Sequence, residues 1–315
     1  MKASRSILAS TLLAQTFALS SAVMLASPVA AQSSAHVPWT QITVQSAKLG
    51  GARPVYVVTP SDYATSGARY PVLVLLDAED EPQFTSAVAN VAFLASRSAI
   101  PKMIIVGVPN GKDRTHDLTP VATGSAAKDF PTAGGAATLT DFIADEVLPL
   151  VRSKYRTLPT TVLAGHSFGG LFAMHAASAK RGVFAGIVAM SASLWWNDST
   201  SAIAYADSIA KSPATARLFA TSGEYEPPIA ITVKRFSAHL DSIRPAGLAF
   251  GHQHYADDTH GLTPVPSLMD GLRFVFEPVS LAVQFQQILS PPFDSVRVMA
   301  TFAELEKSYQ AGART

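Results

Sequence analysis

The hydrophobic pattern changes along the chain, and the change separates two kinds of predicted strand. Apolar and polar residues alternate over residues 42–45 and 53–59, and Gly50-Gly51 between them predicts an opening hairpin. Later apolar segments are short and continuous, which is typical of strands buried on both faces of a parallel sheet. These segments are residues 72–76, 103–108, 161–164, 186–190 and 218–221.

Helical periodicity fills the intervals between these strands. Apolar residues recur at helical spacing over residues 137–155, 169–180 and 229–243. A last predicted strand at 248–255 is followed by a loop and by a helix over about residues 267–276. Because strands and helices alternate, the pattern predicts an α/β fold with a mostly parallel, doubly wound sheet and helices on both faces.

The N-terminal end of the chain departs from this pattern. A short basic segment precedes an uncharged apolar stretch, residues 7–29, which ends in the small-x-small sequence Val29-Ala30-Ala31. We therefore predict a signal peptide over residues 1–31, cleaved between Ala31 and Gln32, and a periplasmic or secreted mature protein without stable membrane insertion. The alternative is an uncleaved membrane anchor, since the apolar run is long enough to span a bilayer.

The strand and helix pattern is confined to residues 32–277, which are predicted to form one domain. Beyond Pro278 the apolar content thins, and Pro291-Pro292 interrupts the chain. Residues 278–315 are therefore predicted to form a C-terminal tail, in which residues 296–310 make a terminal helix.

Composition narrows the chemistry that this domain can perform. Of the 315 residues 48% are hydrophobic, which is enough for a large core, and the net charge of +1 indicates neither a nucleic-acid nor an anionic-membrane partner. The chain has no cysteine, which excludes disulfides, thiol nucleophiles and thiolate metal sites. We predict no metal and no cofactor, and composition does not set the oligomeric state.

A candidate nucleophile follows the strand at 161–164. The strand runs into Gly165-His166-Ser167-Phe168-Gly169-Gly170, and a predicted helix begins at once. In α/β-hydrolases a G-x-S-x-G turn between strand and helix lifts the serine hydroxyl above the sheet, so Ser167 is the predicted nucleophile. The alternative is a glycine-rich turn with an incidental serine, because so short a motif also arises by chance.

The catalytic base of such a fold comes late in the chain, after the serine and the acid. Of the eight histidines, His36 and His116 come too early, His166 lies inside the turn, and His175 and His239 lie on predicted helices, which leaves His252, His254 and His260. The first two alternate on one face of a predicted strand and are interpreted as a surface pair, with a metal pair as the alternative. His260 lies in the loop between the last strand and the last helix, which makes it the predicted base.

The acid and the oxyanion hole are expected at the ends of two other strands. The strand at 218–221 ends in Ser222-Gly223-Glu224-Tyr225-Glu226, and the residues alone do not choose between Glu224 and Glu226. The amide of Phe168 is one expected oxyanion donor, and the loop at residues 76–79 is expected to supply the other. In the alternative interpretation, the two carboxylates of that loop form an acid/base pair.

Further motifs occur in the same order as in a known group of enzymes. They lie at residues 75–77, 114–120, 146–149, 165–172, 191–197, 260–268 and 270–274. On these motifs, over about residues 39–276, the chain resembles the esterase-D-like "Putative esterase" family of α/β-hydrolases. It is most similar to the branch of periplasmic siderophore (enterochelin and salmochelin) esterases.

The resemblance implies roles for several residues. It implies Ser167 as nucleophile and His260 as base, and it favours Glu226 as the acid, three residues after Gly223.

One departure concerns the oxyanion loop, where the family usually has Asp-Gly and this chain has Asp77-Ala78. Alanine disfavours positive φ, so the loop is expected to differ in shape, with Ala78 or Glu79 as the second donor. Arg114 and Asp117 are expected to brace the loop beside the site, and Arg114 is also a candidate for binding substrate.

Together these features predict a carboxylic-ester hydrolase that acts on a small-molecule ester through an acyl-enzyme. Aromatic side chains are expected to line the acyl site, with plain core packing as the alternative; they are Phe84, Phe168, Trp195 and Trp196. Three other functions remain open: a siderophore (catecholate triester) esterase, an acyltransferase or peptidase on the same scaffold, and a non-catalytic binding protein.

Overall fold

The computed structural model describes residues 39–211, 215–282, 295–296, 299–300 and 303. These residues belong to one compact unit, Val37–Thr315. The predicted signal peptide and most of the predicted terminal helix lie outside the described residues. Among the helices that are described, none combines the length and the apolar character needed to cross a bilayer.

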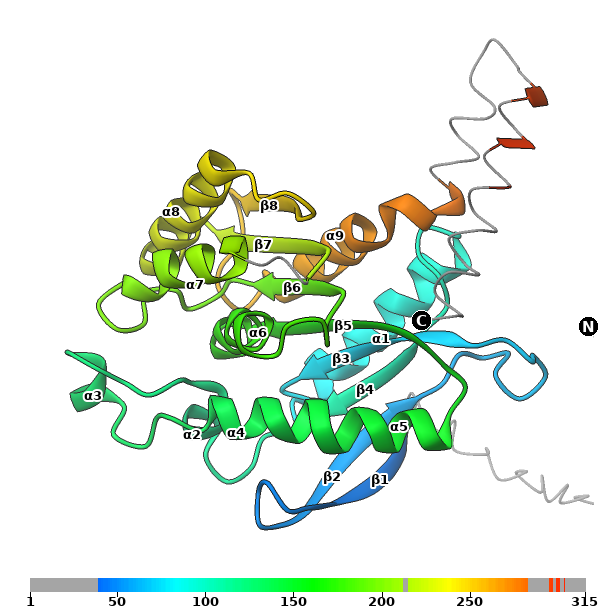
Figure 1. The fold of residues 1–315 in the computed structure, drawn as a ribbon, viewed down its shortest axis with the longest axis horizontal. Coiled ribbons are helices and arrows are strands. Elements are labelled where there is room, and N and C mark those ends of the chain that lie inside the picture. Colours follow the sequence, from blue (N-terminus) through cyan, green and yellow to red (C-terminus); the bar gives the residue numbers. More distant parts are fainter. Residues whose placement is uncertain (1–38, 212–214, 283–294, 297–298, 301–302, 304–315) are drawn as a thin grey trace, which may run out of the picture. The chain divides into compact units, whose positions relative to one another are not determined.

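One eight-stranded sheet forms the centre of the described unit (Figure 1). Two antiparallel pairings join β1 to β2 and β2 to β4, and the five other pairings are parallel. The predicted hairpin and the predicted mostly parallel sheet are thus confirmed. In spatial order the strands are β1 (Thr40–Ser46), β2 (Gly51–Val58), β4 (Ile104–Val108), β3 (Tyr70–Leu76), β5 (Thr157–His166), β6 (Gly186–Met190), β7 (Arg217–Gly223) and β8 (Ala249–Tyr255).

Helices cover both faces of this sheet (Figure 1). Helices α1 (Glu81–Ser96) and α9 (Pro264–Phe276) contribute to the core on one face. The helices that contribute side chains to the core on the other face are α2 (Arg114–Leu118), α3 (Ala126–Asp129), α4 (Ala136–Asp141), α5 (Leu148–Lys154), α6 (Phe168–Ala179), α7 (Thr200–Lys211) and α8 (Pro227–Ile243). A short 3-10 helix, η2 (Glu277–Val279), follows α9.

The continuous apolar runs follow from this two-sided cover. In β3, Val72 and Val74 pack into the core on one face, and Leu73 and Leu75 pack into the core on the other. Successive side chains of a strand point to opposite faces, so a strand covered on both sides has to be apolar at every position.

The helix predicted over residues 137–155 is interrupted in the structure. A π-helical turn, η1 (Phe142–Val147), separates α4 from α5. Pro149 lies in the first turn of α5, where it has no N–H to donate to the preceding turn and its ring would collide with the carbonyl four residues earlier. A widened turn accommodates the proline and lets the chain continue as a helix.

Candidate active site

The candidate site residues come from loops that follow neighbouring parallel strands. Ser167 follows β5, Glu226 follows β7 and His260 follows β8. Carboxyl ends of parallel strands lie at one edge of a sheet, so these loops meet there. They meet beside the point where the strand order 4-3-5 reverses, the position at which open α/β sheets bind ligands.

The turn at Ser167 has the strained geometry of a nucleophile elbow. Ser167 adopts φ 61° and ψ −115°, and its N–H donates to the Met190 carbonyl of β6 at 2.9 Å. A Cβ at Gly165 would lie 2.4 Å from the Gly169 carbonyl oxygen, and one at Gly170 would lie 2.8 Å from the backbone of the loop after β6. The close contacts explain why glycines flank the serine, and the backbone shape lifts its side chain off the sheet.

Glu226 is the glutamate that contacts His260. Its carboxylate, 4% exposed, pairs with His260 Nδ1 and also accepts the Ser191 hydroxyl at 2.7 Å and the Gly223 amide at 2.5 Å. Burial alone would raise the pKa of Glu226, but the hydrogen bonds from His260, Gly223 and Ser191 outweigh it and hold that pKa below its ordinary value. An ionised Glu226 accepts a hydrogen bond from the Nδ1–H of His260. This fixes the proton on Nδ1 and leaves Nε2 as the basic nitrogen.

Glu224 has a different environment. Its side chain is 58% exposed and meets His254 Nε2 at 2.8 Å, while His254 Nδ1 lies 3.0 Å from the Ser222 hydroxyl. His252 and His254 both lie exposed on the edge strand β8, as a surface pair would. In the described part of the chain, no cluster of three or more histidine, aspartate or glutamate side chains could hold a metal ion.

His260, the predicted base, lies against the residue that precedes Ser167, the predicted nucleophile. The rings of His260 and His166 have centroids 4.4 Å apart. Ser167 Oγ lies 3.4 Å from Ser193 Oγ, and no hydrogen bond between Ser167 and His260 occurs among the contacts of the described residues. Nucleophile-to-base hydrogen bonds are often long in the absence of substrate, so this geometry does not argue against His260 as the base.

His166 itself stays neutral. Burial and the neighbouring His260 lower the pKa of His166 to about 4, and its Nε2 is buried without a hydrogen-bond partner. A neutral ring beside His260 adds no full positive charge to the site at neutral pH.

The loop after β3 is held by an ion pair between the buried carboxylate of Asp77 and the partly exposed guanidinium of Arg114. Asp77 has φ 57°, and its carboxylate, 7% exposed, takes two hydrogen bonds from Arg114, at 2.6 and 2.9 Å. Asn110 donates both to Asp77 and to Glu79. The two carboxylates of this loop are therefore tied to structural partners. Positive φ falls on Asp77 and not on Ala78, which explains how alanine replaces the family's glycine without backbone strain.

Arg114 also connects this loop to the elbow. Its guanidinium donates to the His166 carbonyl at 3.3 Å and lies 5.7 Å from the Phe168 ring centroid. Asp117 does not pair with Arg114. It pairs instead with Arg53 at 2.9 Å and accepts the Gly111 amide at 2.6 Å.

The expected aromatic wall is only partly present. Phe168 and Trp195 are partly exposed and pack with Phe130, with ring centroids 5.6 to 6.0 Å apart. Trp196 packs against them but is fully buried. Phe84 is fully buried on the other face of the sheet, against Trp39 and Tyr56, because it lies on the inward side of α1. The interpretation of Phe84 as a wall residue therefore gives way to core packing.

Three residues beside the site are not evident from the sequence. Phe130 lies in a loop without a recognisable motif, while Ser191 and Ser193 lie within a stretch noted only for its resemblance. A serine directly after a buried strand was the available signal, because such positions lie at the carboxyl edge of the sheet.

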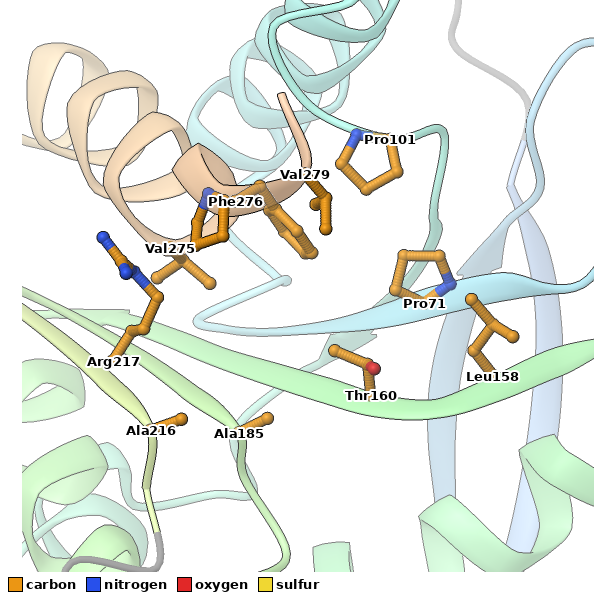
Figure 2. A pocket seen from close by; sticks show the side chains of 11 residues that line it. Pro71, Pro101, Leu158, Thr160, Ala185, Ala216, Arg217, Val275, Phe276 and Val279 are labelled. Atoms are coloured by element: carbon orange, nitrogen blue, oxygen red, sulfur yellow. The ribbon is translucent and has the colours of Figure 1, made fainter. Parts of the chain in front are cut away.

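An apolar depression of about 190 Å³ lies at the opposite edge of the sheet (Figure 2). Leu158 and Thr160 line it from the start of β5, and Ala185 and Ala216 from just before β6 and β7. Figure 2 shows Phe276 of α9 facing the same space. None of the candidate site residues lines this depression.

Known proteins resemble this chain in both sequence and fold. The triacetylfusarinine C esterase of Aspergillus fumigatus is 35% identical over 103 residues, which cover 30% of this chain and 34% of that protein. The siderophore enterobactin esterase of Emericella nidulans is 40% identical over 95 residues, covering 27% and 31%. The aligned part thus spans about a third of these curated relatives.

A solved structure matches over most of both chains. An IroE-like serine hydrolase from Shewanella oneidensis has a TM-score of 0.74 and 29% identity, and the match covers 87% of this chain and 88% of that one. The sheet, the elbow and the loops described above thus occur on the α/β-hydrolase fold. The "Putative esterase" family matches residues 46–229, more than half of the chain, and the chain therefore belongs to that family.

Proposed function

We propose that this protein is a carboxylic-ester hydrolase that forms an acyl-enzyme on Ser167. The observation that carries this proposal is the buried Glu226 paired with Nδ1 of His260, with the imidazole lying beside the elbow. A pair of this kind is what a serine hydrolase needs to fix the tautomer and orientation of its base. Membership of the esterase family supports ester hydrolysis as the reaction.

In the first step, His260 Nε2 takes the Ser167 proton as the serine oxygen attacks the ester carbonyl. Glu226 keeps the Nδ1 proton and stabilises the imidazolium that forms. The imidazolium then protonates the leaving alcohol, and the acyl group remains on the serine. A water molecule, deprotonated by His260, attacks the acyl carbonyl and releases the acid.

The oxyanion of each tetrahedral intermediate is held by two backbone amides. One is the amide of Phe168, the first residue of α6, where the helix dipole favours negative charge. The other is the amide of Glu79. We prefer it to Ala78 because the Ala78 amide is directed to the Val108 carbonyl, at 3.4 Å.

The proposal also covers the residues that contact the substrate and the location of the protein in the cell. Phe168 and Trp195 are proposed to contact the acyl group, because both are partly exposed next to the elbow. Residues 32–277 are proposed as the catalytic domain, with residues 1–31 as a signal peptide that directs the protein to the periplasm or outside the cell.

Hydrolysis of p-nitrophenyl esters of increasing chain length tests the reaction. Ser167→Ala is expected to lower kcat by at least about 10³-fold, the scale on which removal of a nucleophile acts. A fluorophosphonate probe is expected to label the protein, with the label mapped by peptide mass spectrometry to Ser167 and not to the neighbouring Ser193. Full activity of Ser167→Ala, or a label on Ser193, would exclude the assignment.

A second candidate is hydrolysis of siderophore esters, because both curated relatives described above are siderophore esterases. Ferric catecholate triesters assayed beside simple aryl esters distinguish the two substrate classes. A kcat/KM at least about 100-fold higher for the triester would favour this candidate. Product analysis with an added alcohol acceptor separates hydrolysis from acyl transfer.

A further inference from the structure

A serine with no assigned role lies between the candidate acid and the elbow. Ser191 directly follows β6, has φ 43° and is completely buried. Serine pays a conformational penalty of roughly 1 kcal/mol in the left-handed region, and such strain persists where surrounding contacts over-determine the backbone.

The hydroxyl of Ser191 lies between two elements of the site. Its Oγ is 2.7 Å from Glu226 Oε1 and 2.8 Å from Thr263 Oγ1. Thr263 is also buried, and its hydroxyl donates to the carbonyl of His260 at 3.0 Å. One side chain thus contacts the acid directly and reaches the backbone of the base through a single further residue.

The number of protons on these side chains decides which of them donate and which accept. Ser191 has one proton, and an ionised carboxylate only accepts hydrogen bonds, so that proton goes to Glu226. The Ser191 oxygen can then accept the proton of Thr263 when that hydroxyl turns from the His260 carbonyl. Glu226 receives donors at both oxygens: Ser191 and Gly223 at Oε1, and His260 at Oε2.

The backbone of the same loop holds the nucleophile. The Ser167 amide donates to the Met190 carbonyl at 2.9 Å, and the Ser193 amide donates to the Ser167 carbonyl at 3.1 Å. The Ser191 amide donates in turn to the Thr221 hydroxyl of β7 at 3.1 Å. Residues 190–193 therefore connect the elbow to the strand that carries the acid.

We propose that Ser191 is a positioning residue of the esterase. Its hydroxyl holds Glu226 in fixed register with the elbow, and its oxygen is a second acceptor for the Thr263 hydroxyl, which otherwise donates to the His260 carbonyl. This role rests on the proposed function of Ser167 and His260. Because Ser191 is fully buried, its loss acts on the catalytic step and not on contacts with substrate.

Two substitutions separate the hydroxyl from the backbone of Ser191. Ser191→Ala removes the hydroxyl and keeps the penalty of positive φ, whereas Ser191→Gly removes the hydroxyl and relieves it. Both are expected to lower kcat about 10- to 100-fold, the scale on which hydrogen-bond partners that orient metal ligands act, with KM within about two-fold. The rate of fluorophosphonate labelling of Ser167 is expected to fall in parallel.

Ser267→Ala is the matched control. Ser267 is equally buried, and its hydroxyl lies 2.7 Å from Thr221 Oγ1, but it makes no hydrogen bond to Glu226 or His260 among the described contacts. It is expected to lower the melting temperature about as much as Ser191→Ala and to leave kcat unchanged. A merely structural Ser191 would give the same kcat as this control.

Substitutions of Thr263 keep the test decisive if the Ser191 variants fold poorly. Thr263→Ser retains the hydroxyl and is expected to keep kcat within about three-fold, whereas Thr263→Val removes it and is expected to lower kcat about ten-fold. Wild-type kcat in Ser191→Gly, or equal kcat in Thr263→Ser and Thr263→Val, would overturn the role of Ser191. A wild-type protein that neither hydrolyses esters nor labels at Ser167 would instead overturn the proposed function.

Discussion

The two edges of the central sheet differ in backbone strain and in polarity. At the carboxyl edge, the residues that follow β3, β5 and β6 are Asp77, Ser167 and Ser191, and all three have positive φ. Buried polar side chains gather at the same edge. The amino edge carries the apolar depression of Figure 2, where Arg217 is already bound to the Phe274 carbonyl and to Glu277.

The difference between the two edges shows that a depression in the surface does not by itself mark a candidate catalytic site. Leu158 lines the depression and Ser167 is the candidate nucleophile, yet the two are nine residues apart along one extended segment, about 30 Å. Positive φ and buried carboxylates each cost free energy. At the carboxyl edge both persist because surrounding hydrogen bonds hold the backbone and the carboxylates in place. Helix N-termini also point to that edge, which favours developing negative charge there.

The largest effect is expected when the two glutamates of the loop after β7 are substituted one at a time. Glu226→Gln leaves a neutral amide next to His260, and kcat is expected to fall by about 10²- to 10⁴-fold because the imidazolium and the correct tautomer lose their support. Glu224→Gln, at an exposed position, is expected to stay within about two-fold. Steady-state kinetics on one aryl ester measures both, and equal losses would remove the distinction between the two residues.

Arg114→Lys tests the ion pair that ties the oxyanion loop to the elbow. Lysine cannot reproduce the two-pronged contact with the buried Asp77, so the free energy of unfolding is expected to fall by about 1–3 kcal/mol and kcat/KM by about ten-fold. Arg273→Lys is the control, because Arg273 is 62% exposed and its pair with Asp270 is expected to contribute less than about 0.5 kcal/mol. Urea unfolding and kinetics provide the two measurements.

His166 tests how pH acts on the same edge. Its pKa is about 4 in the folded protein and near 6.5 when unfolded, so between these values the unfolded chain binds more protons. The free energy of unfolding is therefore expected to fall as pH drops from about 6.5 to about 4, and the loss due to His166 is expected to be about 1–2 kcal/mol at pH 5. Urea unfolding of His166→Gln at pH 7.5 and 5 is expected to lack that part of the loss. The exposed control His252→Gln should retain it, and identical pH dependence in both variants would contradict the assignment.

The smallest effect is expected at the amino edge. Thr160→Val makes the depression more apolar without changing the size of the side chain, and it alters nothing near Ser167. We expect the free energy of unfolding to change by no more than about 0.5 kcal/mol and kcat/KM by less than two-fold. A large loss of activity would show that the two edges are coupled and would weaken the contrast between them.

Some features follow from the sequence because they depend on short stretches of chain. The run Val72 to Leu76 has to be apolar throughout once both faces of its strand are covered, so its pattern reveals its place in the sheet. The elbow can be recognised because the glycines around Ser167 are required by contacts within one turn and its neighbouring loop. His260 could be predicted as the base for a similar reason, because its place in the loop between the last strand and the last helix follows from local patterns, and the family resemblance implied the same residue.

Other features depended on contacts between distant segments, and only the tertiary structure decided them. The residues alone left Glu224 and Glu226 open, and the family resemblance favoured Glu226. The contacts that distinguish the two, from Ser191 and His260 to Glu226 only, come from distant segments of the chain. Phe84 looks like any aromatic residue near a site until the inward face of α1 is known. Burial and partner choice are set by how elements pack, and no local pattern in the chain records them.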